Sequence, residues 1–429
     1  MILKMFKLEQ NSTTIKQEFI AGLTTFFAML YIIPVNATIM SKAGMPFDAL
    51  VTATALVTIL STIGSGIWAN TPIATSVGMG LNAYFTFGLV IGMKIPWQSA
   101  LGVVFISSIL YFIITLTPLR RWIINTIPLD IKRATSAGIG AFIALIGLKE
   151  MGIVISSQDT LVTLGNLRDP HVLFGLFSFI VALLLSIFKI RGALILSILV
   201  TSALAWISGF SPVPKEFVSL PASLSAIAFE LNIKDALSLA LIPVIMTFLI
   251  TNIFDTIGTL VGLGLRAKLF KDNDSTALQK TMEADAASTI ICGLAGVTST
   301  SPFIESATGI EEGGKTGLST VFTGLLFILP LFFLPIFEAI PSFTIYPILV
   351  IVGSLMFSEL GNIDYNDTAV KYATFFIVLM MPLTYSITNG LMIGAFVYTV
   401  IRVFEKKYDV LRSAMGLMAL IAILLFGVL

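Results

Sequence analysis

The 429-residue chain is 56% hydrophobic and only 11% charged, and its mean hydropathy is +0.98. A soluble domain has about 25% charged residues, so this composition indicates a polytopic α-helical membrane protein. The net charge of +1 argues against binding to nucleic acid, and the single cysteine excludes an internal disulfide bond.

The first half of the chain begins with a polar segment, residues 1–17, and no small-residue cleavage site ends the apolar run that follows. We therefore expect no removable signal peptide. Apolar runs of about 17–25 residues, the length that spans a bilayer as a helix, then recur to the end of the chain. Residues 18–208 are expected to hold seven spans, near 18–40, 47–69, 73–91, 97–117, 134–152, 171–188 and 192–208.

A Pro-rich polar connector, residues 209–234, separates this set from a second one in residues 235–404. The second set has seven spans as well, near 235–264, 283–297, 302–310, 317–337, 343–358, 369–387 and 389–404. A final apolar run, 411–429, lies in the C-terminal segment 405–429 and has no counterpart in the first half. The sequence therefore predicts an all-α protein of about 14 spans in two sets of seven.

The positive charges predict the orientation of these spans. With a cytoplasmic N-terminus, 19 of the 25 Lys and Arg residues, Lys268 and Lys271 among them, fall on the inner side. The positive-inside rule expects such an excess. We therefore expect a multi-pass protein of the bacterial inner (plasma) membrane, with the N-terminus in the cytoplasm and the connector outside. The outer set is Lys42, Lys94, Lys149, Arg168, Lys215 and Lys234.

Seven spans in each half would make the second half an inverted copy of the first, and weak internal similarity favours this arrangement. Segment 70–85 resembles segment 300–310, with Pro72 on Pro302 and Thr75 on Glu305. Transporters with inverted repeats bind substrate near the midplane, where interrupted segments of the two halves meet. We expect broken crossings at 70–85 and 298–310 to form a central site, and the alternative is a pair of turns used only for packing.

Two acids fall inside apolar surroundings: Asp255 in mid-span and Glu305 in the second broken crossing. An ionised acid at mid-bilayer costs about 3 kcal/mol, so such residues are functional candidates. The alternative for Asp255 is a structural role, bonding hydroxyls such as Thr256 and Thr259. A buried acid can also bind and release a proton, which makes Asp255 and Glu305 the candidates for proton coupling.

We expect the remaining charged residues to face solvent or to stabilise helix ends. Glu311 and Glu312 are expected to face water beside Lys315, and Glu283 and Asp285 to act as charges at a helix N-terminus. His171 is expected to be solvated. The sequence has no metal-ligand cluster, Walker motif or nucleophile elbow, so it indicates neither an enzyme nor an ATP-driven pump, and we expect no cofactor and no metal.

Five motifs in order resemble one known family. They are "GLTTFFAMLYIIPVN", "GMGLNAYFTF", "IKRATSAGIGAFIALIGLK", "NIFDTIGTLVG" and "IESATGIEEGGKTGLSTVFTGLLF". Together they resemble the azaguanine-like purine permeases, the adenine/guanine/hypoxanthine branch of the nucleobase–cation symporter-2 (xanthine/uracil permease) family. The resemblance runs from about residue 7 to 404.

The resemblance implies two inverted seven-span repeats, a core domain beside a gate domain, and proton-coupled uptake of purine nucleobases. The family's substrate-contacting acids fall on Asp255 and Glu305, its third-crossing amide on Asn82, and its first-span threonines on Thr24 and Thr25. The chain departs from the family at 301–304, where it has Ser-Pro-Phe-Ile, so the preferred purine stays open.

The chemistry of these residues agrees with a purine substrate, because two acids and an amide accept and donate along its planar edge. Thr75 and Ser306 add hydroxyls from the broken crossings. Phe303 and Phe254 are candidates to stack on the ring, as are Phe26 and Tyr84, which are equally candidates for ordinary packing. The expected partners are a purine, a proton and the lipid bilayer, and we allow for a homodimer.

Two alternatives stay open at this point. One is an anion carrier or channel of the same architecture, for sulfate or bicarbonate, which two acids at the midplane oppose because they repel an anion. The other is a membrane scaffold that transports nothing, which leaves the paired breaks unexplained.

Overall fold

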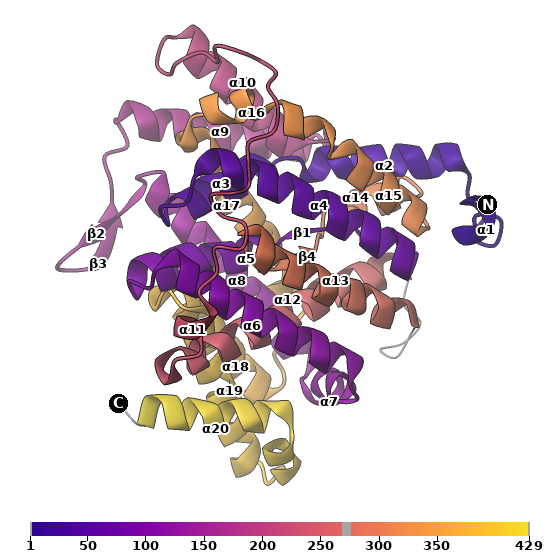
Figure 1. The fold of residues 1–429 in the computed structure, drawn as a ribbon. Coiled ribbons are helices and arrows are strands. Elements are labelled where there is room, and N and C mark those ends of the chain that lie inside the picture. Colours follow the sequence, from indigo (N-terminus) through magenta and orange to yellow (C-terminus); the bar gives the residue numbers. More distant parts are fainter. Residues whose placement is uncertain (1, 268–275, 428–429) are drawn as a thin grey trace.

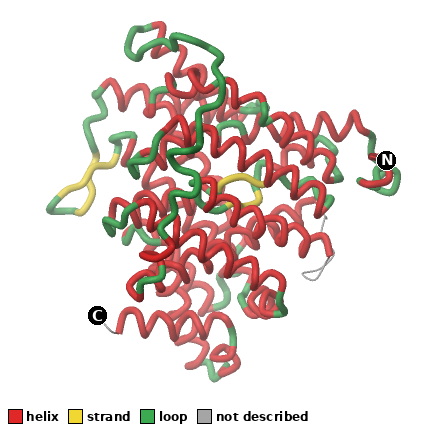
Figure 2. The backbone as a smooth tube through the Cα atoms, in the orientation of Figure 1, coloured by secondary structure: helices red, strands yellow, loops and turns green. Residues whose placement is uncertain are grey.

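The computed structural model describes residues 2–267 and 276–427. Lys268 and Lys271, two of the predicted inner-side charges, lie outside the described residues. Eight described helices are long and apolar enough to cross a membrane, and shorter apolar helices accompany them. Each of the fourteen predicted spans contains a helix, so the predicted all-α architecture is confirmed (Figures 1 and 2).

The first half runs from α1 to α10 and includes a π-helix, η1. Its α2 begins after Thr14, whose side chain accepts a hydrogen bond from the amide of Gln17 and so caps the helix. The elements are α1 (Ile2–Met5), α2 (Ile15–Met29), α3 (Ile32–Ser41), α4 (Phe47–Ala69), β1 (Thr75–Val77), α5 (Met79–Ala83), η1 (Tyr84–Gly92), α6 (Trp97–Leu116), α7 (Leu119–Thr126), α8 (Leu129–Glu150), β2 (Val154–Ser157), β3 (Leu161–Leu164), α9 (Pro170–Ile187) and α10 (Ala193–Ile207).

The second half runs from α11 to α20 after an irregular connector, which Figure 1 shows crossing one face of the molecule. Its elements are α11 (Ile233–Ala236), η2 (Leu239–Leu241), α12 (Ile242–Ala267), α13 (Thr276–Ala295), β4 (Thr300–Pro302), α14 (Ser306–Glu311), α15 (Gly317–Leu326), η3 (Leu329–Phe332), α16 (Leu334–Ala339), α17 (Ser342–Phe357), η4 (Ser358–Asn362), α18 (Thr368–Leu383), α19 (Ile387–Phe404), η5 (Tyr408–Arg412) and α20 (Ala414–Gly427). The hairpin of β2 and β3 was not predicted, and the final apolar run forms α20.

The helices pack as two bundles. Helices α2–α6 and α12–α15 contact one another extensively, and we call them the core bundle. Helices α8–α10 and α17–α19 form the gate bundle. Each bundle combines helices of both halves, which is the intertwined arrangement that an inverted repeat produces. Contacts of α8 with α5 and α12, and of α17 with α3, join the bundles.

Glycines let helices approach closely inside each bundle. A Cβ atom at Gly353 of α17 would lie 2.4 Å from the carbonyl oxygen of Gly140 of α8, and one at Gly140 would lie 2.5 Å from that of Gly353. Gly317 and Gly66 make a similar contact between α15 and α4. Small residues at helix crossings are how membrane helices gain packing contacts, because lipid supplies no hydrophobic drive between them.

The two halves of the chain meet in a short antiparallel sheet at the centre of the molecule (Figure 2). Thr75 of β1 pairs with Pro302 of β4, and Ser76 pairs with Ser301. The Phe303 amide extends the ladder, since it donates to the Ala74 carbonyl at 2.9 Å. This pairing satisfies main-chain groups that could not stay unpaired in a membrane.

This sheet also corrects the predicted alignment of the two halves. Thr75 is the first residue of β1, and the first residue of β4 is Thr300, so Thr75 does not correspond to Glu305. Glu305 immediately precedes α14 as Gly78 immediately precedes α5. The prediction was wrong by a few residues because short Ser, Thr and Pro runs align equally well in several registers.

Candidate functional site

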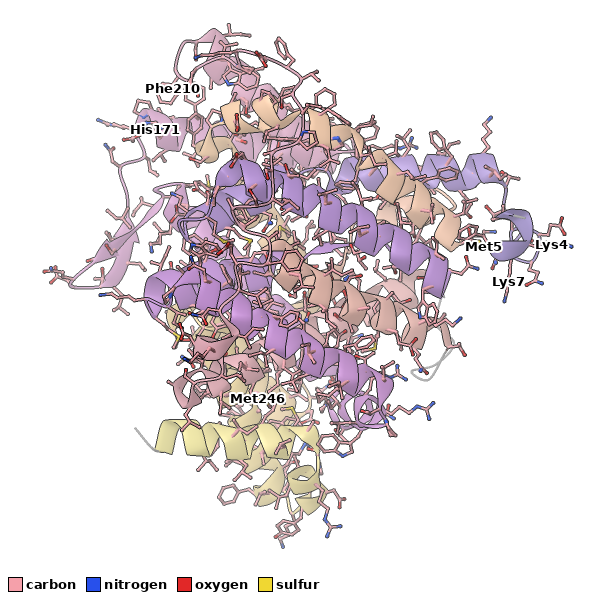
Figure 3. All side chains as sticks on the ribbon, viewed as in Figure 1. Lys4, Met5, Lys7, His171, Phe210 and Met246 are labelled. Carbon is pink, nitrogen blue, oxygen red and sulfur yellow. The ribbon has the colours of Figure 1, made fainter. Side chains whose placement is uncertain are left out.

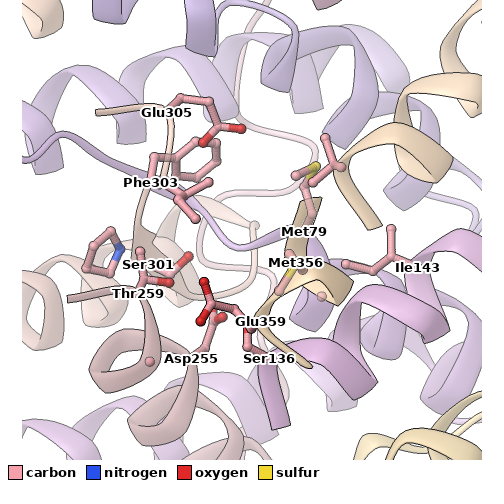
Figure 4. A pocket seen from close by; sticks show the side chains of 15 residues that line it. Met79, Ser136, Ile143, Asp255, Thr259, Ser301, Phe303, Glu305, Met356 and Glu359 are labelled. Atoms are coloured by element: carbon pink, nitrogen blue, oxygen red, sulfur yellow. The ribbon is translucent and has the colours of Figure 1, made fainter. Parts of the chain in front are cut away.

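One cavity lies between the two bundles and takes residues from both (Figure 4). About 630 Å³ there is filled by no protein atom, and this volume includes space that is open to solvent. The core bundle supplies residues of α5, α12 and the β4–α14 segment, and the gate bundle supplies residues of α8, α17 and η4. The lining residues are Met79, Gly80, Ser136, Ile143, Asp255, Gly258, Thr259, Ser301, Pro302, Phe303, Ile304, Glu305, Val352, Met356 and Glu359.

Asp255 lies on α12 and faces this cavity. The Ser301 side chain, on β4, lies beside its carboxylate in the cavity lining (Figure 4). A Cβ atom at Gly78 would lie 3.6 Å from Asp255 Oδ2 and 3.2 Å from Ser301 Oγ, so the backbone before α5 passes close to the acid. Asp255 therefore sits where the broken crossings of both halves meet.

Glu305 lies at the start of α14 and faces the same cavity. The hydroxyl of Tyr31, at the junction of α2 and α3, donates a hydrogen bond to Glu305 Oε1. Tyr31 is fully buried, so this contact fixes the carboxylate from behind while the carboxylate still faces the cavity. Phe303 lies two residues before Glu305 and presents its ring to the cavity (Figure 4).

The structure therefore brings three of the predicted site residues, Asp255, Phe303 and Glu305, around one cavity. It does not bring the other six into that lining. Asn82 is buried and donates to Asn36 Oδ1, which joins α5 to α3. Thr24 and Thr25 donate to main-chain oxygens one turn earlier in α2, at 3.0 and 3.1 Å.

Ser306, Thr75 and Phe254 also lie outside the lining. Ser306 Oγ accepts a hydrogen bond from the Ala74 amide at 3.0 Å, which ties α14 to β1. Thr75 is fully buried, and its carbonyl accepts hydrogen bonds from Ser61 and Thr62.

Phe254 faces an apolar pocket formed by α6, α7, α12 and α20. Phe26 packs against Phe27 and Phe327, and Tyr84 packs against Phe248. Of the four aromatic candidates for stacking, Phe303 alone lines the cavity.

Asp285 is a residue that the sequence interpretation misjudged. Helix α13 begins at Thr276, seven residues before the predicted span start, so Asp285 lies in mid-helix and is fully buried. Its Oδ2 accepts hydrogen bonds from Thr256 at 2.7 Å and Tyr111 at 3.2 Å. Thr256 follows Asp255 in α12, so Asp285 stands behind the cavity wall. Glu311 is exposed, as predicted, and the partly exposed Glu312 pairs with Arg191.

His171 does not line the cavity, and Figure 3 shows it near Phe210 at one end of the molecule. Its ring is exposed and contacts Phe210 and Phe343. Among the described residues, no group of three or more His, Cys, Asp or Glu side chains could hold a metal ion.

Several lining residues were missed from the sequence. Ser136 and Glu359 belong to the gate bundle, and Tyr31 supports the site from the first span. A tyrosine inside an apolar span was a signal for Tyr31. Glu359 carried none, because an acid at a span end reads as an ordinary solvated residue.

Comparisons with known proteins agree with this architecture. The transmembrane domain of a cyanobacterium bicarbonate transporter, BicA, superimposes with a TM-score of 0.64 at 14% identity, over 88% of this chain and 97% of that one, which shows the fold alone. The guanine/hypoxanthine permease PbuO of Bacillus subtilis is 37% identical over 98% of this chain and 99% of its own length. The adenine permease AdeQ of Escherichia coli is 36% identical over 94% of this chain and 91% of its own length.

A model of the permease family also matches residues 16–393, nearly the whole described architecture. Family membership makes the protein a membrane-embedded permease, not an enzyme. The resemblance seen in the five sequence motifs is thereby confirmed: the chain belongs to the permease family that includes the adenine and guanine/hypoxanthine permeases.

Proposed function

We propose that this protein is a secondary transporter that carries purine nucleobases, adenine, guanine and/or hypoxanthine, into the cell. The observation that carries the proposal is the placement of Asp255, Glu305 and Phe303 around one cavity between two helix bundles. The relatives named for guanine/hypoxanthine and adenine transport support the same substrate class.

The lining suits a flat base with polar edges. Ionised carboxylates only accept hydrogen bonds, and the N–H groups of a purine only donate them. Asp255 and Glu305 can therefore hold a purine by its edge, while the Phe303 ring offers a face for stacking. Because both bundles line the cavity, displacement of one bundle against the other moves the substrate from one side of the membrane to the other.

The alternative function is that of an anion carrier. It needs a test because the chain shares its fold with a bicarbonate transporter. The cavity chemistry opposes it, because two carboxylates in a low-dielectric site repel an anion. Sulfate and bicarbonate therefore belong in the substrate panel.

We propose that transport is driven by coupling to protons. We also propose that the protein lies in the cell membrane with its N-terminus in the cytoplasm. The excess of Lys and Arg on the inner side supports this orientation. Asp255 and Glu305 are the proposed proton carriers. One charge that crosses about 150 mV yields about 3.5 kcal/mol. At about 1.4 kcal/mol per tenfold, this energy supports a few-hundred-fold accumulation.

The test is uptake of radiolabelled adenine, guanine, hypoxanthine, uracil, sulfate and bicarbonate by cells that express the chain. We expect uptake of at least one purine, higher at external pH 6 than at pH 8, abolished by a protonophore and unchanged when choline replaces sodium. Uptake of sulfate or bicarbonate without purine uptake would contradict the purine assignment. Purine uptake that needs sodium and survives the protonophore would contradict only the coupling.

A further inference from the structure

A third carboxylate, that of Glu359, also lines the cavity, and it comes from the gate bundle whereas Asp255 and Glu305 come from the core bundle. Glu359 belongs to η4, which follows α17 and packs against α8, so it is part of the gate bundle. Figure 4 shows its side chain reaching into the cavity in the region of Asp255 and Ser136. Neither the sequence motifs nor the proposed function gives this residue a role.

The surrounding residues hold Glu359 in a defined position. The Asn362 side-chain amide donates to Glu359 Oε2 at 3.2 Å. The Asn362 carbonyl in turn accepts a hydrogen bond from Arg133 of α8 at 2.6 Å, and Arg133 pairs with Asp130 at 3.2 Å. The carboxylate is therefore attached to the first turn of α8 through a short chain of polar contacts.

The position of η4, packed against α8, places this carboxylate near the end of the gate bundle where α8 begins. Arg133 and Asp130 lie in the first two turns of α8, at the end of the gate bundle that the proposed orientation assigns to the cytoplasm. Glu359 is partly exposed there and lines the cavity that holds Asp255 and Glu305. We therefore expect a purine that moves between those acids and the cytoplasm to come within reach of this carboxylate.

We infer that Glu359 binds the purine at the cytoplasmic mouth of the cavity and thereby determines affinity from that side alone. The inference rests on the proposed function. The carboxylate accepts hydrogen bonds from purine N–H groups as the base moves to or from the site formed by Asp255 and Glu305. Because Glu359 is on the gate bundle, its distance from Asp255 and Glu305 changes when the bundles shift, so it takes no part when the cavity opens to the other side.

The experiment measures KM for labelled hypoxanthine, adenine and guanine in right-side-out and inside-out membrane vesicles. The variants are Glu359→Gln and Glu359→Asp, with Asp364→Asn as a control at an exposed acid of the next loop that does not line the cavity. Glu359→Gln replaces the charged acceptor of a purine N–H hydrogen bond by a neutral one. It should therefore raise the KM in inside-out vesicles by roughly three- to tenfold. In right-side-out vesicles the KM should stay at the wild-type value.

Glu359→Asp keeps the charge with a shorter reach and should give a smaller increase on the same side. Asn362→Ala, which removes the contact that positions the carboxylate, should act in the same direction. An unchanged KM on both sides overturns the inference, and so does an equal increase on both sides. If Glu359→Gln does not fold, Glu359→Asp and Asn362→Ala decide by the same criterion. Wild-type vesicles that take up none of the three purines would instead contradict the proposed function.

Discussion

The Tyr31 hydroxyl donates its hydrogen bond to the carboxylate of Glu305, across a gap of 274 residues in the sequence. Tyr31 comes from the α2–α3 junction of the first half and Glu305 from the broken crossing of the second half. The contact leaves the carboxylate facing the cavity, so one acid of the candidate site is oriented by the opposite half of the chain.

Tyr31→Phe is expected to impair transport without unfolding the protein, because the ring is kept and only the donor is lost. Hydrogen bonds to charged groups contribute about 1.5–3 kcal/mol, so hypoxanthine uptake should fall by roughly tenfold or more. Initial uptake rates at equal membrane expression measure the effect. Tyr111→Phe, which removes a hydroxyl behind the cavity wall, is the comparison and should reduce uptake less. Wild-type uptake by Tyr31→Phe would show that the contact does not orient Glu305 for transport.

Asp285 is expected to matter for stability. In Asp285→Ala, the hydroxyls of Thr256 and Tyr111 lose their common acceptor. Leaving a buried donor without a partner costs about 1–3 kcal/mol, so the melting temperature in detergent should fall clearly. Asp285→Asn keeps an acceptor oxygen and should melt between Asp285→Ala and the wild type. If Asp285→Ala has the same melting temperature as the wild type, Asp285 is not a structural hydrogen-bond acceptor.

The Gly140–Gly353 crossing should not tolerate an added methyl group. A Cβ at Gly353 would lie 2.4 Å from the Gly140 carbonyl oxygen, so Gly353→Ala forces α8 and α17 apart. Overpacking of this kind costs about 1–3 kcal/mol. Gly361→Ala is the matched control, since nothing lies within 4 Å of a Cβ there. Thermal unfolding should separate the two variants, and equal melting temperatures would contradict the close packing.

A surface ion pair joins the two bundles at the end of α3. Lys42 Nζ lies 3.3 Å from Glu150 Oε2 of α8. By the proposed orientation this is the outer end, so the pair must break when the cavity opens outward. Exposed pairs contribute about 0.2–1 kcal/mol, so Lys42→Gln should lower the KM from the outer side by less than about fivefold. The exchange Lys42→Glu with Glu150→Lys should restore the wild-type KM. A higher outer KM in Lys42→Gln would argue against this role.

Much of this architecture could be predicted from the sequence, and the failures have identifiable causes. Hydropathy and length located the spans, and the cost of burying acids singled out Asp255 and Glu305. Asp285 was misplaced because polar residues early in α13 hid the true start of that helix. Thr75 was aligned with Glu305 because short Ser, Thr and Pro runs align equally well in several registers, and only the positions of β1 and β4 distinguish these registers.

The lining residues that come from the gate bundle could not be predicted from the sequence, for a similar reason. Ser136 and Glu359 lie far from the core-bundle acids in sequence, and only the packing of α8, α17 and η4 brings them to the cavity. The same packing turned Phe254 away from the cavity, toward an apolar pocket beside α20.

The central claim is that Asp255 and Glu305 bind a purine nucleobase in the cavity between the bundles. The most direct measurement is counterflow of radiolabelled hypoxanthine, adenine and guanine into liposomes that contain the purified protein and unlabelled purine, because this exchange needs no ion gradient. Asp159→Asn and Glu216→Gln, at exposed acids outside the cavity lining, are the matched controls. We expect counterflow by the wild type and both controls, and background exchange by Asp255→Asn and Glu305→Gln. Near-normal counterflow by both cavity variants, or none by the wild type with any of the three purines, would contradict the claim.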